Sequence, residues 1–276
     1  MARRRVVQGT TVSTFSTVGA PTGPGGVDSR NLSGMGHRQR QLTTGLLDLL
    51  DVISPRDCVG CTRPGRLLCA DCGRALDVAP FLVDRIDPPA VAAGWLDGVL
   101  GSVVRGYKSG AGRTLVGPLS ERLVAVLAHP LLAGPLPAGP LLADGQGGSR
   151  PRAIVPVPPS LRARWTRGED IWGRVVQRAV MRMQRSGAPL VYLPILEPVR
   201  RVRDQRHLGA QERAMNLIGS LRVRDRMLPA DPERYDWIIA DDVLTTGATL
   251  REAARALEDV VPTERLRGAA VIAVTR

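Results

Sequence analysis

One segment of the chain, residues 237–250, restricts the possible folds more than any other. Its first four residues form an apolar run, Trp-Ile-Ile-Ala, which is typical of a strand buried on both faces of a sheet. Residues 251–258 have the apolar spacing and the residue types of a helix. Two aspartates, three threonines and one glycine stand between the two, so the chain must turn sharply there. A buried strand that leads directly into a helix predicts an α/β fold.

The same order of strand and helix recurs elsewhere in the chain. We predict a helix at residues 170–185 and strands at 153–157, 190–193 and 269–274. Residues 98–110 and 113–127 carry apolar side chains at helical spacing and predict two packed helices. The alternation indicates a mostly parallel sheet with helices on both faces. Residues 130–150, rich in Pro, Gly, Leu and Ala, predict an irregular insertion.

The turn after the strand at 237–240 has the chemistry of a sugar-phosphate site. Backbone N–H groups and hydroxyls gather at the N-terminus of the predicted helix, where unpaired donors and the helix dipole favour a phosphate. The residues of this loop are Thr245, Thr246, Gly247, Ala248 and Thr249. Asp241 and Asp242, at the carboxyl end of the strand, can accept hydrogen bonds from two neighbouring ribose hydroxyls. The alternative is an ordinary strand-turn-helix in which Asp and Thr cap the helix.

All four cysteines lie within fifteen residues, as two Cys-x-x-Cys pairs: Cys58, Cys61, Cys69 and Cys72. Two such pairs can supply four thiolates to a tetrahedral Zn²⁺, and Gly60 and Gly73 would ease the turns that the pairs make. Because four thiolates leave no open position for water, such a zinc would be structural rather than catalytic. Two disulfides, which a cytoplasmic chain disfavours, and a redox-active pair are the alternatives.

Composition divides the chain into three regions. Residues 1–42, rich in Gly, Ser, Thr and Arg, predict a disordered tail, within which Met35 offers a second start for translation. Residues 43–80 predict a helix followed by the zinc-binding module, and residues 90–276 predict the larger domain. Since no apolar stretch approaches the roughly 18 residues of a membrane span and no secretory h-region is present, we expect a cytoplasmic protein without membrane insertion.

The net charge of +12 favours anionic partners such as phosphates or nucleic acid. The excess is concentrated in residues 150–213, which carry fourteen Arg against five acidic residues. These arginines favour contact with DNA phosphates, whereas an aromatic content of 3% disfavours binding of single strands by base stacking. Lys108, the one lysine of the chain, is expected either to contact an anion or to be solvated at a helix end.

The order of apolar strand, paired acids and Thr-Thr-Gly-Ala-Thr loop resembles the signature of type I phosphoribosyltransferases. The resemblance implies binding of phosphoribosyl pyrophosphate, with Asp241 and Asp242 at the ribose hydroxyls and residues 245–249 around the 5′-phosphate. It also implies a ribosyl transfer that displaces pyrophosphate, with Mg²⁺ bound to the diphosphate substrate. Arg167 would then meet the pyrophosphate, and Arg203 would belong to a mobile lid.

Further motifs extend the resemblance to one family. They are the four-cysteine module, Tyr107-Lys-x-Gly, Val155-Pro-Val-Pro-Pro, Arg167-Gly, Arg203-x-Gln-x-x-Leu and Arg213-x-x-Asn. In this order they resemble the ComF family of bacterial competence-associated proteins, over residues 45–276. The resemblance implies a role in DNA uptake, either as a transferase or as a non-catalytic adaptor for single-stranded DNA or a competence helicase. One pair departs from the family pattern, because Glu169-Asp170 stands where Phe-Asn is usual and adds two negative charges beside the expected phosphate site.

Overall fold

The computed structural model describes residues 57–109, 112–134, 150–159, 170–199 and 217–276, which belong to one compact unit, Asp51–Arg276. The predicted tail, the helix expected after residue 43, and the site residues Arg167 and Arg203 lie outside the described residues. Within the described part of the chain, no helix has both the length and the apolar character needed to cross a membrane.

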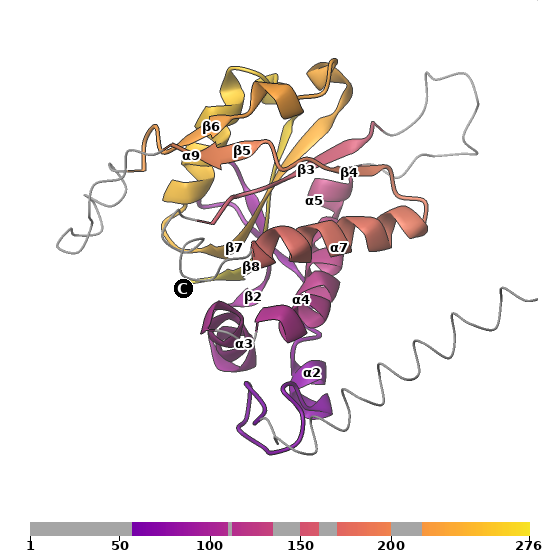
Figure 1. Cartoon of the computed structure of the whole chain (residues 1–276), viewed down its shortest axis with the longest axis vertical. Coiled ribbons are helices and arrows are strands. Elements are labelled where there is room, and N and C mark those ends of the chain that lie inside the picture. The colour runs from indigo at the N-terminus through magenta and orange to yellow at the C-terminus, as the bar shows by residue number, and fades with distance from the viewer. Residues whose placement is uncertain (1–56, 110–111, 135–149, 160–169, 200–216) are drawn as a thin grey trace, which may run out of the picture. The chain divides into compact units, whose positions relative to one another are not determined.

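A six-stranded sheet organises this unit (Figure 1). Its strands, in spatial order, are β1 (Phe81–Val83), β2 (Ala90–Trp95), β8 (Leu266–Val274), β7 (Asp236–Leu244), β3 (Arg152–Pro156) and β4 (Leu190–Tyr192). Neighbouring strands run parallel except for β1 and β2, which are antiparallel. The prediction of a mostly parallel sheet is therefore confirmed.

Helices cover both faces of this sheet, as the alternation predicted (Figure 1). One face carries α3 (Gly98–Ser109), α4 (Gly112–Leu127) and α7 (Ile171–Arg185), and the other carries α9 (Ala248–Glu258) and a hairpin of β5 (Leu196–Pro198) and β6 (Leu221–Val223). In β7, Ile238 and Ala240 pack with the first set, whereas Trp237 and Ile239 pack with the second. Since successive strand residues point to opposite faces, a strand buried on both must be apolar throughout.

Shorter elements complete the unit: the helices α2 (Ala70–Ala75) and α5 (Pro130–Ala133) and the 3₁₀ turns η1 (Asp225–Met227), η2 (Pro232–Arg234) and η3 (Thr263–Arg265). The sequence did not predict β1, β2 or the hairpin strands. β2 reads Ala-Val-Ala-Ala-Gly-Trp and contains only one β-branched residue. It becomes a strand through its pairing with β8, because tertiary context overrides a weak local preference.

The strand order creates a topological switch point at the carboxyl end of the sheet. From β3 the chain passes through α7 to β4 on one side, and from β7 it passes through α9 to β8 on the other. The two connecting helices lie on opposite faces, so they diverge above the neighbouring carboxyl ends of β3 and β7. Open α/β sheets bind ligands at such a topological switch point.

Candidate functional site

The two predicted ribose ligands lie at this switch point, near the carboxyl end of β7. Asp241 is 9% exposed, and its Oδ1 accepts a hydrogen bond from the backbone N–H of Asp242 at 2.8 Å. The Asp242 side chain is 24% exposed, and its Oδ1 pairs with Nζ of Lys108 at 3.0 Å. Lys108 lies in the last turn of α3. The chain's one lysine therefore forms an ion pair with a predicted site residue.

The two acids differ in their electrostatic surroundings. Burial and, after it, the adjacent charge of Asp242 raise the pKa of Asp241 to about 7. The backbone N–H of Asp242 and the charge of Lys108 favour the ionised form, but they do not outweigh these two causes. Near neutral pH, Asp241 can therefore either donate or accept a hydrogen bond.

The loop after β7 has the backbone conformation of a tight turn into a helix. Gly247, the N-cap of α9, has φ 77° and ψ 0°, in the left-handed region that favours glycine. A Cβ at this position would lie 3.2 Å from the side chain of Ile86, so space as well as backbone conformation selects glycine. The first turn of α9 contains no acidic residue. The positive end of its dipole therefore faces the loop without a negative side chain from that turn.

The remaining loop residues lie at the surface and at the start of α9. Thr245 and Thr246 are exposed, whereas Ala248 and Thr249 are half-buried at the start of α9. The hydroxyl of Thr246 accepts a long hydrogen bond from the backbone N–H of Ala248, at 3.4 Å. Arg251 donates to the carbonyl of Thr246 at 3.1 Å and fixes the turn from the helix side.

Two contacts anchor the neighbouring strand and helix beside Asp241. The backbone N–H of Val157, just after β3, donates to the carbonyl of Ala240 at 2.8 Å. Nε1 of Trp172, in the first turn of α7, donates to the same carbonyl at 3.1 Å. The sequence analysis did not identify Trp172 as part of this region, because its hydrogen bond depends on where α7 crosses the sheet.

Asp170, one of the two acids that depart from the ComF pattern, has a structural role. Its side chain caps α7 by accepting a hydrogen bond from the backbone N–H of Gly173 at 2.8 Å. Tyr192 lies beside it, and burial, followed by the charge of Asp170, raises the pKa of Tyr192 to about 12. Glu169 lies outside the described residues, as do the arginines of the loop that precedes it.

A cavity of about 270 Å³ lies next to this region but does not contain the acid pair. Leu257, Val261 and Leu266 give it an apolar wall, and Asp87, Glu258 and Arg251 supply its charged groups. Arg251 also holds the turn at Thr246, so the cavity and the loop share one side chain.

The four cysteines form a second cluster, in which all four sulfurs lie within 4.8 Å of one another. The Sγ atoms of Cys61 and Cys69 are 3.7 Å apart. A tetrahedral zinc with Zn–S bonds of about 2.3 Å separates its sulfurs by about 3.8 Å, so this spacing fits four thiolates around one ion. All four cysteines are free of disulfide bonds, so the alternative of two disulfides is not realised. The structure confirms that they are close enough to bind a metal ion.

The surroundings shift the pKa of two of these thiols in opposite directions. Burial opposes ionisation of Cys58, but N–H groups of Cys69, Gly60 and Cys61 outweigh it and lower the pKa of Cys58 to about 6. Burial, followed by the neighbouring sulfurs, raises the pKa of Cys72 to about 12. Ionisation of all four thiols at this spacing would therefore require a cation between them.

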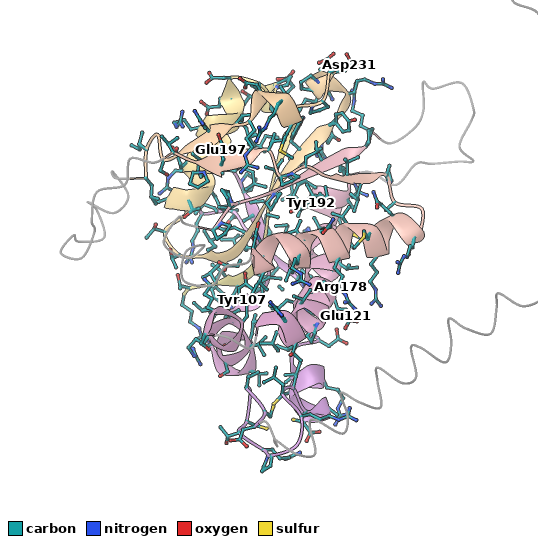
Figure 2. All side chains as sticks on the ribbon, in the orientation of Figure 1. Tyr107, Glu121, Arg178, Tyr192, Glu197 and Asp231 are labelled. Carbon is teal, nitrogen blue, oxygen red and sulfur yellow. The ribbon has the colours of Figure 1, made fainter. Side chains whose placement is uncertain are left out.

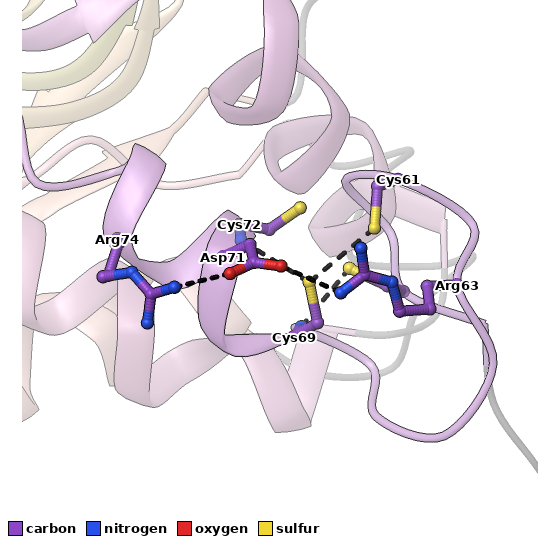
Figure 3. Close-up of polar contacts among 7 residues, drawn as sticks. Cys61, Arg63, Cys69, Asp71, Cys72 and Arg74 are labelled. Atoms are coloured by element: carbon purple, nitrogen blue, oxygen red, sulfur yellow. Dashed lines mark hydrogen bonds and ion pairs between the residues drawn. The ribbon is translucent and has the colours of Figure 1, made fainter.

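Polar and apolar contacts hold the cysteine turns in place. Asp71 accepts hydrogen bonds from Arg63 at 2.8 Å and from Arg74 at 2.5 Å, which joins the first turn to α2 (Figure 3). A Cβ at Gly60 would lie 2.7 Å from the Cys72 sulfur, so close approach requires this glycine. Gly73 lies inside α2 with open space around it, so the prediction that it eases a turn is wrong.

The cysteine turns rest on α3. A Cβ at Gly106 of α3 would lie 3.1 Å from Cγ1 of Val59, and one at Gly60 would lie 3.1 Å from Cγ1 of Val99. Val59 also packs against the hydrophobic core that α3, α4 and α7 share, as does Leu67. The cluster is therefore supported by the same helix that carries Lys108.

Comparisons of the chain with models of known protein families and with curated protein sequences give no match. The functional conclusion therefore depends on the residues of the site themselves.

Proposed function

We propose that residues 241–249 bind a sugar phosphate of the phosphoribosyl pyrophosphate type, in a ComF-like protein that acts as a phosphoribosyltransferase. One observation carries this proposal. Two adjacent aspartates lie near the carboxyl end of a strand at the topological switch point, and a turn with a left-handed glycine leads from that strand into a helix N-terminus. That order provides carboxylates that can accept hydrogen bonds from sugar hydroxyls on one side, and N–H groups that can donate hydrogen bonds to a phosphate on the other.

Each part of the site has a distinct role in this proposal. Asp241 and Asp242 accept hydrogen bonds from the ribose hydroxyls. The N–H groups and hydroxyls of residues 245–249 bind the 5′-phosphate. Bound with the diphosphate substrate, Mg²⁺ would supply positive charge that offsets the charge of the leaving diphosphate. The protein's own contribution is to orient the sugar and to position charge, which lowers the barrier to a transition state with cationic character at the anomeric carbon.

Lys108 supports the proposal because it lies beside the acids and is cationic. It neutralises Asp242, with an Nζ to Oδ1 distance of 3.0 Å. A partly exposed ion pair of this kind contributes little net stability. Its ammonium group can therefore be redirected to a phosphate oxygen at small cost when a ligand enters.

We propose that the four-cysteine cluster holds a structural Zn²⁺ and is inherited with the same ComF-like architecture. The four free cysteines and their spacing support zinc over the harder cations, because thiolates are soft ligands. Bound there, the ion would connect the two turns at Cys58–Cys61 and Cys69–Cys72.

Calorimetry with phosphoribosyl pyrophosphate and Mg²⁺ tests the sugar-phosphate site. Wild-type protein should release or absorb heat with a single binding isotherm, and the double variant Asp241→Asn/Asp242→Asn should lose it. Asp231→Asn is the matched control, because this exposed aspartate lies before the amino end of β7. A wild-type protein that gives no heat would rule the site out.

A nucleic-acid adaptor is the second candidate, and the exposed face of α7 favours it. Arg174, Arg178, Arg182 and Arg185 are exposed along this helix at intervals of three or four residues. Arg182 pairs with Glu121 of α4 at 3.0 Å, and Figure 2 shows Arg178 and Glu121 at the junction of the two helices. Such a row suits successive phosphates of a single strand.

Fluorescence anisotropy with a labelled oligonucleotide tests the adaptor. Binding should weaken steeply with salt, and Arg178→Gln/Arg185→Gln should reduce the affinity and the salt dependence together. The same variant should leave the calorimetric signal of phosphoribosyl pyrophosphate unchanged. Absence of oligonucleotide binding at low salt would exclude direct DNA contact.

A further inference from the structure

Two aromatic side chains, Phe81 and Trp95, pack together at the carboxyl end of β2. The ring centroids of Phe81 and Trp95 are 5.0 Å apart, with an angle of 34° between the ring planes. Trp95 is 38% exposed, whereas the other described tryptophans, Trp172 and Trp237, are 4% and 0% exposed. A large aromatic ring left open to water beside a second ring is a surface that another planar ring can cover.

The aromatic pair lies on the same edge of the sheet as the proposed sugar-phosphate site. Trp95, the last residue of β2, is in register with Val274 of β8, and Val274 is in register with Leu244 at the end of β7. Two strand spacings separate Trp95 from Leu244, which is on the order of 10 Å. That distance matches the scale of a pentose phosphate. A ring on Trp95 and a phosphate in the turn at 245–249 can therefore belong to neighbouring substrates.

Helix α3 links the two places. It begins at Gly98, three residues after Trp95, and its last turn carries Lys108, which pairs with Asp242. Backbone hydrogen bonds also join the ends of these strands. The N–H of Leu96 donates to the carbonyl of Val274 at 2.8 Å, and the N–H of Thr275 donates to the carbonyl of Leu244 at 3.0 Å. The aromatic pair and the acid pair are therefore held by one set of strand ends and one helix.

A well-exposed cation accompanies the Trp95 ring. The guanidinium carbon of Arg276 lies 5.9 Å from the centroid of the Trp95 ring, and Arg276 pairs with Asp97 at 3.0 Å. Both partners of this ion pair are well exposed, with 79% and 57% of their side-chain surfaces accessible, so the pair resists displacement only weakly. Arg276 can move aside for an incoming ring or stack on its outer face.

From this arrangement we propose that Trp95 and Phe81 form a stacking platform for the acceptor of the transfer, a planar nitrogen heterocycle of nucleobase size. The inference rests on the proposed function of residues 241–249. A ring nitrogen held there would form the new C–N bond to the anomeric carbon. The C–O bond to the diphosphate breaks at the same centre, the diphosphate leaves with its electron pair, and the proton of the ring nitrogen passes to solvent.

Tryptophan fluorescence provides a direct test of the platform. Full-length protein is titrated with adenine, hypoxanthine and uracil, first alone and then with phosphoribosyl pyrophosphate and Mg²⁺. At least one base should quench the emission of Trp95. Trp95→Leu should abolish this quenching and, by calorimetry, weaken the base at least about tenfold, while Trp95→Tyr should retain most of the affinity. Dihydrouracil, which is not aromatic, should bind worse than uracil.

The outcomes separate this proposal from the one on which it rests. If Trp95→Leu loses the base but binds phosphoribosyl pyrophosphate like wild type, the platform is supported. If Asp241→Asn/Asp242→Asn loses phosphoribosyl pyrophosphate but still binds the base through Trp95, the ring site holds independently of the sugar site. The platform is overturned if no base binds, if Trp95→Leu binds every base like wild type, or if Trp95→Leu affects only an oligonucleotide.

Discussion

At the residue scale, the acid pair places two chemically identical side chains in different surroundings. Asp242 is tied to a lysine and partly exposed, whereas Asp241 is buried beside it. In a sugar site the raised pKa of Asp241 would be useful, because a carboxylate accepts hydrogen bonds only, while a protonated carboxyl can also donate one. The buried residue should therefore make stability, and binding at the proposed sugar site, sensitive to pH.

We expect Asp241 to lower the free energy of unfolding as the pH rises. Its pKa is about 7 in the folded protein, whereas the ordinary value of 3.8 applies to the unfolded chain. Between these two pH values the folded state therefore binds more protons than the unfolded state. Stability should therefore fall across that interval, by about 2–4 kcal/mol. Asp241→Asn should flatten this part of the profile and stabilise the protein above pH 7. Urea unfolding across the pH range measures the effect, and Asp231→Asn should leave the profile unchanged.

Gly247 offers a test of the turn. Gly247→Ala should destabilise by about 1–2 kcal/mol from the left-handed backbone alone, and by more from the contact with Ile86 at 3.2 Å. Gly187 has φ 83°, but a Cβ at that position would meet nothing within 4 Å, so Gly187→Ala isolates the backbone contribution. Urea unfolding gives both values. Equal losses in the two variants would show that the contact with Ile86 is easily relieved.

At the scale of elements, α9 is held to the hairpin by a buried carboxylate. Glu252 is 3% exposed, and it accepts hydrogen bonds from the backbone N–H of Leu221 at 2.9 Å and from Nε of Arg255 at 2.7 Å. Burial opposes its ionisation, but Arg255 and the backbone N–H groups outweigh burial and lower the pKa of Glu252. The helix that follows the turn at 245–247 is thus fixed at its middle to β6.

Glu252→Ala should destabilise the protein by about 3 kcal/mol, because it leaves the buried N–H of Leu221 without a side-chain acceptor and Arg255 without its carboxylate partner. Glu121→Ala removes an ion pair in which both side chains are exposed, and should cost at most about 1 kcal/mol. Chemical denaturation of the two variants gives the comparison. Similar losses would mean that burial of Glu252 does not determine its contribution.

At the scale of the whole described unit, the cysteine cluster and the sheet share a core through Val59 and Leu67. We expect purified protein to contain one zinc per chain, and a strong chelator to lower the midpoint of thermal unfolding. Cys61→Ser should lose zinc and unfold at the midpoint of the chelated wild type, because structural zinc contributes folding free energy directly. Metal analysis and calorimetric scanning check this, and a chelator without effect on a zinc-containing protein would contradict it.

Local sequence predicted those parts of the molecule that depend on local pattern. The run at 237–240 indicated a buried strand, and the cysteine spacing indicated a site for one metal ion, because each signal lies within a short stretch of sequence. β7 nevertheless extends to Leu244, since its pairing with β8 continues to Val274. The ion pair between Lys108 and Asp242 joins side chains 134 residues apart. Such a pair depends on where α3 crosses the sheet edge, which no local pattern specifies.

The support of the cysteine turns on α3 makes the two proposed ligands thermodynamically linked. Loss of zinc would loosen the turn at Val59, and with it the helix whose last turn places Lys108 against Asp242. Linkage is reciprocal, so any factor by which zinc strengthens sugar-phosphate binding is also the factor by which the sugar phosphate strengthens zinc binding. Protein saturated with phosphoribosyl pyrophosphate should therefore retain its metal at chelator concentrations that strip the free protein.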